Sequence, residues 1–256
     1  MIELQNVCAG YPGREVLHDI NLSIPEGEVM VLVGPNGCGK STLLKTLVRI
    51  LPHSAGRILV DGRDAESYAP NALAQKIAYL SQGKSVPDIT VQRMVLHGRF
   101  PYLSYPRRYR ALDYTAADAA MAQLGITDLA NQPMGQLSGG MQQKVYIAMA
   151  LAQDAPTIFM DEPTTYLDVS HQLQLMDIAR ELAGCGKTVV MVLHDLAMAM
   201  ENADRMVVME RGRMIDTGTP EAIYSRGTVD EVFGICVTRI ETPGGWKYYY
   251  DRRKRG

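Results

Sequence analysis

One stretch of eight residues constrains the fold of this chain more than any other feature. Gly34-Pro35-Asn36-Gly37-Cys38-Gly39-Lys40-Ser41 fits the pattern GxxxxGK[ST] at every fixed position. The continuous apolar run Val29–Val33 precedes it, and Thr42–Ile50 can form a helix. Glycines let a backbone curl so that its N–H groups converge on phosphate oxygens, and a following helix adds the positive end of its dipole. The stretch therefore predicts a strand, a phosphate-binding loop and a helix in succession.

The last residues of this loop suit a nucleotide and its magnesium ion. Lys40 can place a full positive charge against the β- and γ-phosphates, and the hydroxyl of Ser41 can bind Mg²⁺. The loop by itself does not separate kinases, GTPases and motor ATPases. No Asn-Lys-x-Asp element, which would read guanine, is present, and this weakens the GTPase interpretation.

The apolar pattern around the loop predicts an α/β fold. Apolar Val16, Ile20, Leu22 and Ile24 partly alternate with polar residues, which is typical of half-exposed antiparallel strands. Thr157–Met160 and Thr188–Leu193 are apolar throughout, as in a parallel sheet covered on both faces. Val91–Ala152 has a mostly helical pattern interrupted by prolines. We expect a nucleotide-binding P-loop core with a mixed parallel sheet, an N-terminal antiparallel β subdomain and an inserted α-helical subdomain.

The length and composition suit one domain. With 256 residues and 46% apolar residues, the chain can bury a sizeable core. We expect a single domain over residues 1–256, with the α/β core and β subdomain in about 1–85 and 153–220. The helical subdomain is expected at 86–152, and a short C-terminal extension at 221–256.

Charge and cysteines exclude several classes of protein. The net charge of −2 argues against a protein that coats nucleic acid. The four cysteines are too far apart in sequence for a zinc knuckle or a CxxC pair, which favours a reducing, intracellular environment. We find no secretory signal and no apolar run that could span a bilayer, so attachment to a membrane would need a partner.

A second set of motifs makes the interpretation specific. Leu137-Ser138-Gly139-Gly140-Met141-Gln142-Gln143 precedes a helical run, and a hydrophobic strand ending in Asp161-Glu162-Pro163-Thr164 follows about twenty residues later. This pair resembles the signature motif and Walker B motif of the ATP-binding-cassette ATPases. Other residues that resemble family motifs occur in the expected order along the chain: Tyr11, Gln82, Tyr166-Leu167-Asp168 and His194. The resemblance covers roughly residues 1–220.

The resemblance implies a role for each matching residue. The nucleotide-binding residues would be Tyr11, Gly34, Pro35, Asn36, Gly37, Cys38, Gly39, Lys40, Ser41 and Thr42. Tyr11 would stack on adenine, and Ser41, Gln82 and Asp161 would serve the metal. Glu162 can act as general base on the attacking water, and His194 can sense the γ-phosphate. ATP and Mg²⁺ are the expected substrate and cofactor.

The same resemblance implies a dimer. Ser138, Gly139, Gly140 and Gln142 would close over the nucleotide of a second copy of the chain, because a cassette does not bring this element onto its own phosphate loop. Asp168 would lie in the D-loop at the dimer contact. ATP would then hold two copies together, and hydrolysis would release them.

Three kinds of cassette protein compete: a transporter motor, a soluble cassette acting on ribosomes or DNA, and a regulatory module without turnover. Only one cassette is present, no long coiled coil interrupts it, and both Glu162 and His194 are retained, so transport is favoured. An exporter motor remains an alternative. The stretch Val95–Tyr102 resembles the "GR-x-P" element of importers for ferric siderophores, haem and cobalamin, and Asp216–Pro220 and Glu231–Gly234 are similar to the same subfamily.

This importer interpretation implies two permease subunits, an extracytoplasmic solute-binding protein and a place on the cytoplasmic face of the cell membrane. Arg99–Arg110, which reads RFPYLSYPRRYR, combines arginines and aromatic residues. That composition suits single-stranded nucleic acid or a protein contact, and the slight acidity of the chain favours a protein. We expect this segment to contact the permease and no nucleic acid to bind. The terminal run Asp251–Arg255 is interpreted as solvated charge.

Overall fold

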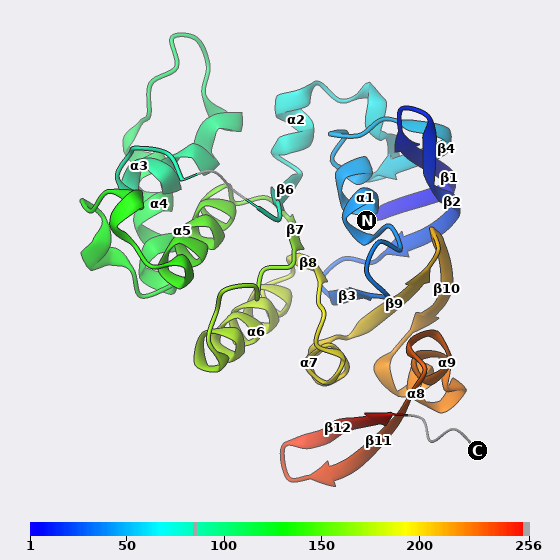
Figure 1. Cartoon of the computed structure of the whole chain (residues 1–256). Helices are drawn as coiled ribbons and strands as arrows, with labels where there is room; N and C mark the ends of the chain where they lie inside the picture. Colours follow the sequence, from blue (N-terminus) through cyan, green and yellow to red (C-terminus); the bar gives the residue numbers. More distant parts are fainter. Residues whose placement is uncertain (84–85, 253–256) are drawn as a thin grey trace. The chain divides into compact units, whose positions relative to one another are not determined.

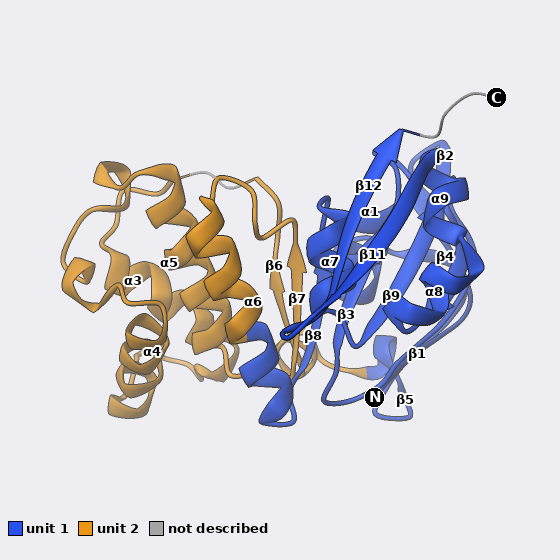
Figure 2. Ribbon diagram, turned by 90° about the horizontal axis from the view of Figure 1, so that it is seen from below, with its two compact units in different colours: residues 1–67, 179–256 blue, residues 68–178 orange. Residues whose placement is uncertain are grey.

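The computed structural model describes residues 1–83 and 86–252 (Figure 1). It divides into two compact units, Met1–Ser67 with Ala179–Gly256 and Tyr68–Ile178, which Figure 2 colours blue and orange. The first unit carries the predicted phosphate loop. The second carries the segment predicted to be helical.

An antiparallel sheet opens the first unit. Its strands lie in the order β2-β1-β4-β5. They are β1 (Ile2–Tyr11), β2 (Arg14–Ile24), β4 (His53–Val60) and β5 (Arg63–Asp64). The expected alternation holds from Ile20 to Ile24, where apolar side chains are buried and polar ones are exposed. It fails before Asp19, where the register of β1 and β2 shifts, so that Leu17 is buried in place of Val16.

Four further strands of this unit carry the nucleotide loop, in the order β10-β9-β3-β8. They are β3 (Val29–Val33), β8 (Thr188–Val192), β9 (Arg205–Glu210) and β10 (Arg213–Gly218). β3 runs parallel to both β8 and β9, and β10 is antiparallel to β9. Every residue of β3 and β8 is buried, as their continuous apolar runs predicted. The expected fold class is confirmed.

Helices and a hairpin complete the first unit. The helical elements are α1 (Lys40–Leu47), η1 (Ala65–Ser67), α7 (Leu196–Asn202), α8 (Pro220–Arg226) and α9 (Thr228–Phe233). The hairpin strands are β11 (Ile235–Thr242) and β12 (Gly245–Arg252), which Figure 1 draws in red beside α7. The sequence predicted no hairpin in this extension. Of the terminal charge run, Asp251 and Arg252 are exposed in β12, and Arg253 to Arg255 lie outside the described residues.

The second unit joins two parallel strands to a group of helices. The strands are β6 (Ile77–Leu80) and β7 (Thr157–Asp161). The helical elements are α2 (Pro70–Ala74), α3 (Val91–Leu96), η2 (His97–Tyr102), α4 (Ala111–Gln123), η3 (Thr127–Leu129), η4 (Met134–Gln136), α5 (Gly139–Ala152) and most of α6 (Val169–Gly184). α5 packs against both α3 and α4 (Figure 1). Among the described residues, no helix is both long and apolar enough to cross a membrane.

Candidate functional site

The phosphate loop is a tight backbone turn between β3 and α1. Gly37 and Gly39 have φ angles of 76° and 109°, which are unfavourable for residues other than glycine. A Cβ atom on Gly34 would lie 2.2 Å from the carbonyl oxygen of Met209. Asn36 and Gly37 form the exposed tip, whereas Cys38 is buried. The loop therefore needs its glycines both for conformation and for close packing.

Lys40 lies inside this loop. Lys40 is 5% exposed, and its Nζ donates hydrogen bonds to the carbonyl oxygens of Gly34 and Pro35 at 2.7 and 3.1 Å. The ammonium is thus held by the backbone of the same loop whose N–H groups were predicted to face phosphate. Ser41 is half-buried at the start of α1, and Thr42 is buried behind it.

A turn that the sequence analysis did not single out braces the loop. The N–H of Gly212, between β9 and β10, donates to the carbonyl of Cys38 at 2.9 Å. The carbonyl of Gly212 accepts from the N–H of His18 in β2 at 2.9 Å. A Cβ atom on Gly212 would lie 1.9 Å from the carbonyl oxygen of Val16. The phosphate loop is therefore tied through Gly212 to the antiparallel sheet.

Two further predicted residues of the first unit are exposed. Tyr11 ends β1 at its turn into β2, and 45% of it is accessible to solvent. His194 follows β8, and Asp195 beside it caps α7 by accepting from the N–H of Met198 at 2.9 Å. Both side chains can therefore meet a ligand.

In the second unit, a cavity of about 540 Å³ brings five predicted site residues together. Gln82, Gly139, Gln142, Asp161 and Glu162 all line it. The side-chain amide of Gln82 donates a hydrogen bond to Oε2 of Glu162. The hydroxyl of Tyr79, which the sequence analysis did not single out, donates to Oδ2 of Asp161 at 3.3 Å. Asp161 ends β7 and is buried, whereas Glu162 has a left-handed φ of 52° at the following turn. The cavity thus collects carboxylate and amide groups, the oxygen donors that Mg²⁺ prefers.

The signature stretch begins α5 at the rim of the same cavity. Ser138 caps the helix by accepting from the N–H of Met141 at 3.4 Å. A Cβ atom on Gly140 would lie 3.2 Å from the carbonyl oxygen of Tyr166, so this helix start packs closely on the D-loop. The amide of Gln142 donates to the carbonyls of Met134 and Leu137, within its own unit. Ser138 and Gly139 are exposed, as a contact with another molecule requires.

Asp168 lies just before α6, with 67% of its side chain exposed. Its Oδ1 accepts from the backbone N–H of His171 at 2.9 Å and also lies 2.9 Å from Nδ1 of the same residue. The backbone hydrogen bond from His171 is the main cause that lowers the pKa of Asp168. An ionised carboxylate is therefore presented at the surface of the second unit.

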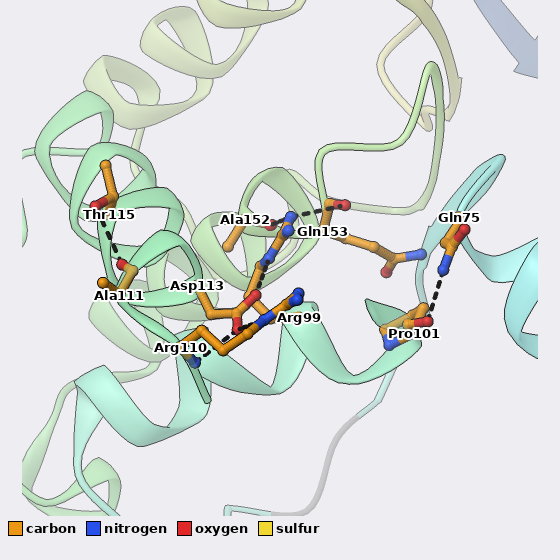
Figure 3. Close-up of polar contacts among 9 residues, drawn as sticks. All are labelled: Gln75, Arg99, Pro101, Arg110, Ala111, Asp113, Thr115, Ala152 and Gln153. Atoms are coloured by element: carbon orange, nitrogen blue, oxygen red, sulfur yellow. Dashed lines mark hydrogen bonds and ion pairs between the residues drawn. The ribbon is translucent and has the colours of Figure 1, made fainter. Parts of the chain in front are cut away.

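The arginine-rich segment divides into a half-buried part and an exposed part. Figure 3 shows Arg99 between α4 and the end of α5. Its Nε bonds Oδ1 of Asp113 at 3.2 Å, and its Nη1 donates to the carbonyl of Ala152 at 3.0 Å. Tyr105, in contrast, is 96% exposed. Arg99 thus holds helices together, and a continuous exposed stretch, residues 104–108, follows it in the segment.

A family model described as ABC transporter matches residues 17–165 of this chain. The chain belongs to this family. The match begins in β2 and ends after the Asp161–Glu162 pair, so it contains the phosphate loop and the signature stretch described above. It confirms the family resemblance inferred from the motifs.

Individual members of the ABC family extend the match over nearly the whole chain. The achromobactin transport ATP-binding protein of Dickeya dadantii is 39% identical over 94% of this chain and 91% of its own length. The ferric enterobactin transport ATP-binding protein of Escherichia coli is 38% identical, over 93% of this chain and 89% of its own length. A solved chain from a transporter described as metal-chelate type, in an inward-facing conformation, is 25% identical. It covers 98% of this chain and 96% of the solved chain, with a TM-score of 0.83.

Proposed function

We propose that this chain is the ATP-hydrolysing subunit of an ABC importer that drives a metal chelate through a membrane permease. The chelate would be a ferric siderophore, haem or cobalamin. The observation that carries this proposal is the likeness over more than nine-tenths of the chain to ATP-binding proteins named for achromobactin and ferric enterobactin transport. A relative named for cobalamin import is 38% identical over 86% of this chain, although the match spans only 56% of that relative.

In this proposal residues 1–256 act as one ATPase domain, with 86–152 as its helical subdomain. Gly34 to Thr42 bind the phosphates and Tyr11 stacks on the adenine. Lys40 already faces the centre of the loop, which suits a charge that meets the β- and γ-phosphates. Ser41, Gln82 and Asp161 offer the oxygen ligands that would hold Mg²⁺, which supplies charge neutralisation on the phosphates.

Glu162 is the general base of the proposed reaction. Its carboxylate must accept a proton from the water that attacks the γ-phosphate in line. The Gln82 amide donates to Oε2 in this structure, which positions the carboxylate, and a carboxylate has further lone pairs on both oxygens with which to accept a proton from water. His194, exposed after β8, contacts the γ-phosphate and reports its loss.

The active form is a dimer of this chain. Ser138, Gly139, Gly140 and Gln142 of one copy close over the nucleotide bound to the phosphate loop of the other, and Asp168 lies at their contact. Exposure of Ser138, Gly139 and Asp168 supports this arrangement. The dimer is attached by permease subunits to the cytoplasmic face of the membrane.

Glu162→Gln tests the dimer and the base together. The variant should bind MgATP, hydrolyse it at least a hundredfold more slowly, on the order expected for a lost general base, and elute as a dimer from a size-exclusion column. Without the general base, ATP is not hydrolysed, so the γ-phosphate that both copies contact stays in place and the dimer persists. A monomer at saturating MgATP would contradict the proposed dimer.

The direction of transport and the identity of the transported solute can be tested only with the assembled transporter. The chain would be co-expressed with a candidate multi-helix permease and a candidate binding protein, and reconstituted in vesicles with the cassette outside. ATP added outside should drive ferric siderophore, haem or cobalamin from the lumen, which corresponds to the extracytoplasmic side, to the outside. The reverse direction would indicate an exporter, and failure to copurify with any permease would indicate a cassette not linked to transport.

A further inference from the structure

A buried lysine follows the signature stretch in the second unit. Lys144, in α5, is 8% exposed. Within residues 1–83 and 86–252, its ammonium makes neither a hydrogen bond nor an ion pair. Burial lowers the pKa of Lys144, as expected for a charge removed from water. None of the steps proposed above uses this group.

The surroundings of Lys144 lead to the D-loop. A small cavity, with room for about one water molecule, is lined by Lys144 and His171 among apolar side chains such as Ile147, Leu167 and Leu175. His171 in turn touches Oδ1 of Asp168 through both its backbone N–H and its ring Nδ1. Lys144 therefore shares a cavity wall with His171, the residue whose backbone and ring contact the Asp168 carboxylate.

Charge attraction also couples the two groups directly. The backbone N–H of His171 contributes most to the lowered pKa of Asp168, and the positive charge of Lys144 adds to it. Asp168 in turn favours the protonated form of Lys144. A poorly solvated cation in the cavity wall thus attracts the exposed Asp168 carboxylate, which His171 of the same cavity wall contacts.

A simpler explanation is that the aliphatic stem of Lys144 fills space beside Ile147 and Leu175. A filler would not need the charge, and a methionine of similar length would serve as well or better, because burying an unpaired ammonium is costly. The two explanations therefore make opposite predictions for removal of the charge alone.

We propose that Lys144 is a positioning residue that holds the Asp168 carboxylate, and with it the start of α6, in the orientation that meets the second copy of the chain. The signature helix and the D-loop of one unit are then linked by charge. This inference rests on the proposed ATP-dependent dimer.

Dimerisation in the Glu162→Gln background tests this role. We would measure the MgATP concentration at half-maximal dimer by size exclusion with light scattering, for Lys144→Met, Lys144→Arg and Asp168→Asn. Lys144→Met should raise that concentration about two- to fivefold, the range expected for a partly exposed charge pair. Lys144→Arg, which keeps the charge, should stay within twofold of the parent. In the Asp168→Asn background, Lys144→Met should add no further change.

Equal effects of Lys144→Met and Lys144→Arg, or the same effect with and without Asp168, would show that packing alone matters and would overturn the proposal. A second readout uses the nucleotide-free chain. The pKa of the Asp168 carboxyl, followed by carbon NMR, should rise in Lys144→Met, and an unchanged value would also overturn it. If the Glu162→Gln parent stays monomeric with MgATP, the proposed dimer fails, and the Asp168 pKa still decides whether Lys144 acts on that carboxylate.

Discussion

At the scale of single residues, hydrogen bonds from neighbouring groups hold the candidate site residues in place. Lys40 donates to two carbonyls of its own loop, so its ammonium is in place before any phosphate arrives. Gln82 holds Glu162, and the N–H of Gly212 holds the carbonyl of Cys38. Such preorganisation lowers the entropy that ligand binding has to overcome.

Lys40→Met should weaken ATP binding because it removes the charge that we propose to face the phosphates. Charge-assisted hydrogen bonds of this kind contribute about 1.5–3 kcal/mol, so the Kd for ATP should rise roughly 10- to 100-fold. Isothermal titration calorimetry with ATP, or a fluorescence titration with a labelled ATP, measures this Kd. Lys45→Met, on the same helix α1 but outside the loop, is the matched control and should bind as the parent does. Equal affinities for the two variants would exclude the assigned role of Lys40.

At the scale of elements, an ion pair with a buried carboxylate joins separate helical elements of the second unit. Asp113 in α4 is fully buried and accepts from Arg99 of η2 and from the backbone N–H of Arg110 (Figure 3). Burial by itself would raise the pKa of Asp113, but these two partners hold it below its usual value. Arg99 also donates to the carbonyl of Ala152 at the end of α5. The Asp113–Arg99 pair therefore links three helical elements, η2, α4 and α5.

Asp113→Ala should destabilise the second unit strongly, because it leaves the guanidinium of Arg99 without its carboxylate. Breaking a buried pair in this way costs about 3–5 kcal/mol. Asp118→Ala, an exposed position on the same helix, should change the free energy of unfolding by less than about 0.5 kcal/mol. Urea unfolding of both variants gives the comparison, and a similar loss in both would mean that the Asp113 pair is not a main support.

A second carboxylate fastens the C-terminal helices of the first unit. Arg226 of α8 bonds both oxygens of Asp216 in β10, at 2.8 and 2.9 Å, and Thr228 Oγ1 donates to Oδ2 at 2.6 Å. Partial burial would raise the pKa of Asp216, but the bonds from Arg226 and Thr228 keep it below its ordinary value. The stretch that suggested a subfamily in the sequence thus has a structural purpose.

The pH dependence of stability tests this fastening. Because the pKa of Asp216 is lower in the folded than in the unfolded chain, its contribution is fully present above the unfolded value of about 3.9 and is lost as the pH falls through the folded value. Asp216→Asn should therefore lower stability by about 1–2 kcal/mol at pH 7 and by progressively less below about pH 4. Thermal unfolding of both proteins across that range measures the difference. A gap that stays constant down to the lowest pH would contradict the assignment.

At the scale of the whole molecule, the proposed function requires contact with a permease. The exposed remainder of the arginine-rich segment is its most distinctive free surface, with Tyr105 almost fully accessible and Phe100 partly so. Neither Arg107 nor Arg108 has a carboxylate partner within the described part of the chain. Tyr and Arg are enriched where proteins bind each other. We therefore expect the permease contact here, at Tyr105 rather than at Tyr102, which packs under Arg99.

A photo-crosslinker at position 105 should capture a permease subunit in the active transporter. The same group at Leu173, exposed on α6 of the same unit, serves as the control and should give a weaker product or none. Denaturing gels and mass spectrometry identify the partner. Equal crosslinking at both positions, or none at 105 in a complex that transports, would contradict this contact.

Much of the fold and of the candidate site could be predicted because it is local in sequence. The strand, glycine turn and helix around Lys40 follow one another along the chain, and the conformations they need are set by glycine and by continuous apolar runs. Asp161 and Glu162 follow a buried strand in the same way. Register was harder to predict, because the irregularity near Asp19 buried Leu17 in place of Val16. The C-terminal hairpin was missed, since its strands are stabilised by packing on α7 and α8 rather than by a strong apolar alternation.

The sequence by itself determined the phosphate loop, the acidic pair, the signature helix start and the family, because each is a short pattern whose chemistry is carried by adjacent residues. Only the tertiary structure decided that Gly212 braces the loop, that Gln82 holds Glu162, that Arg99 is internal and that Lys144 is a buried charge. Those features join residues from 14 to nearly two hundred positions apart. Their partners are chosen by packing and by the need to satisfy buried polar groups, and neither leaves a pattern in the nearby sequence.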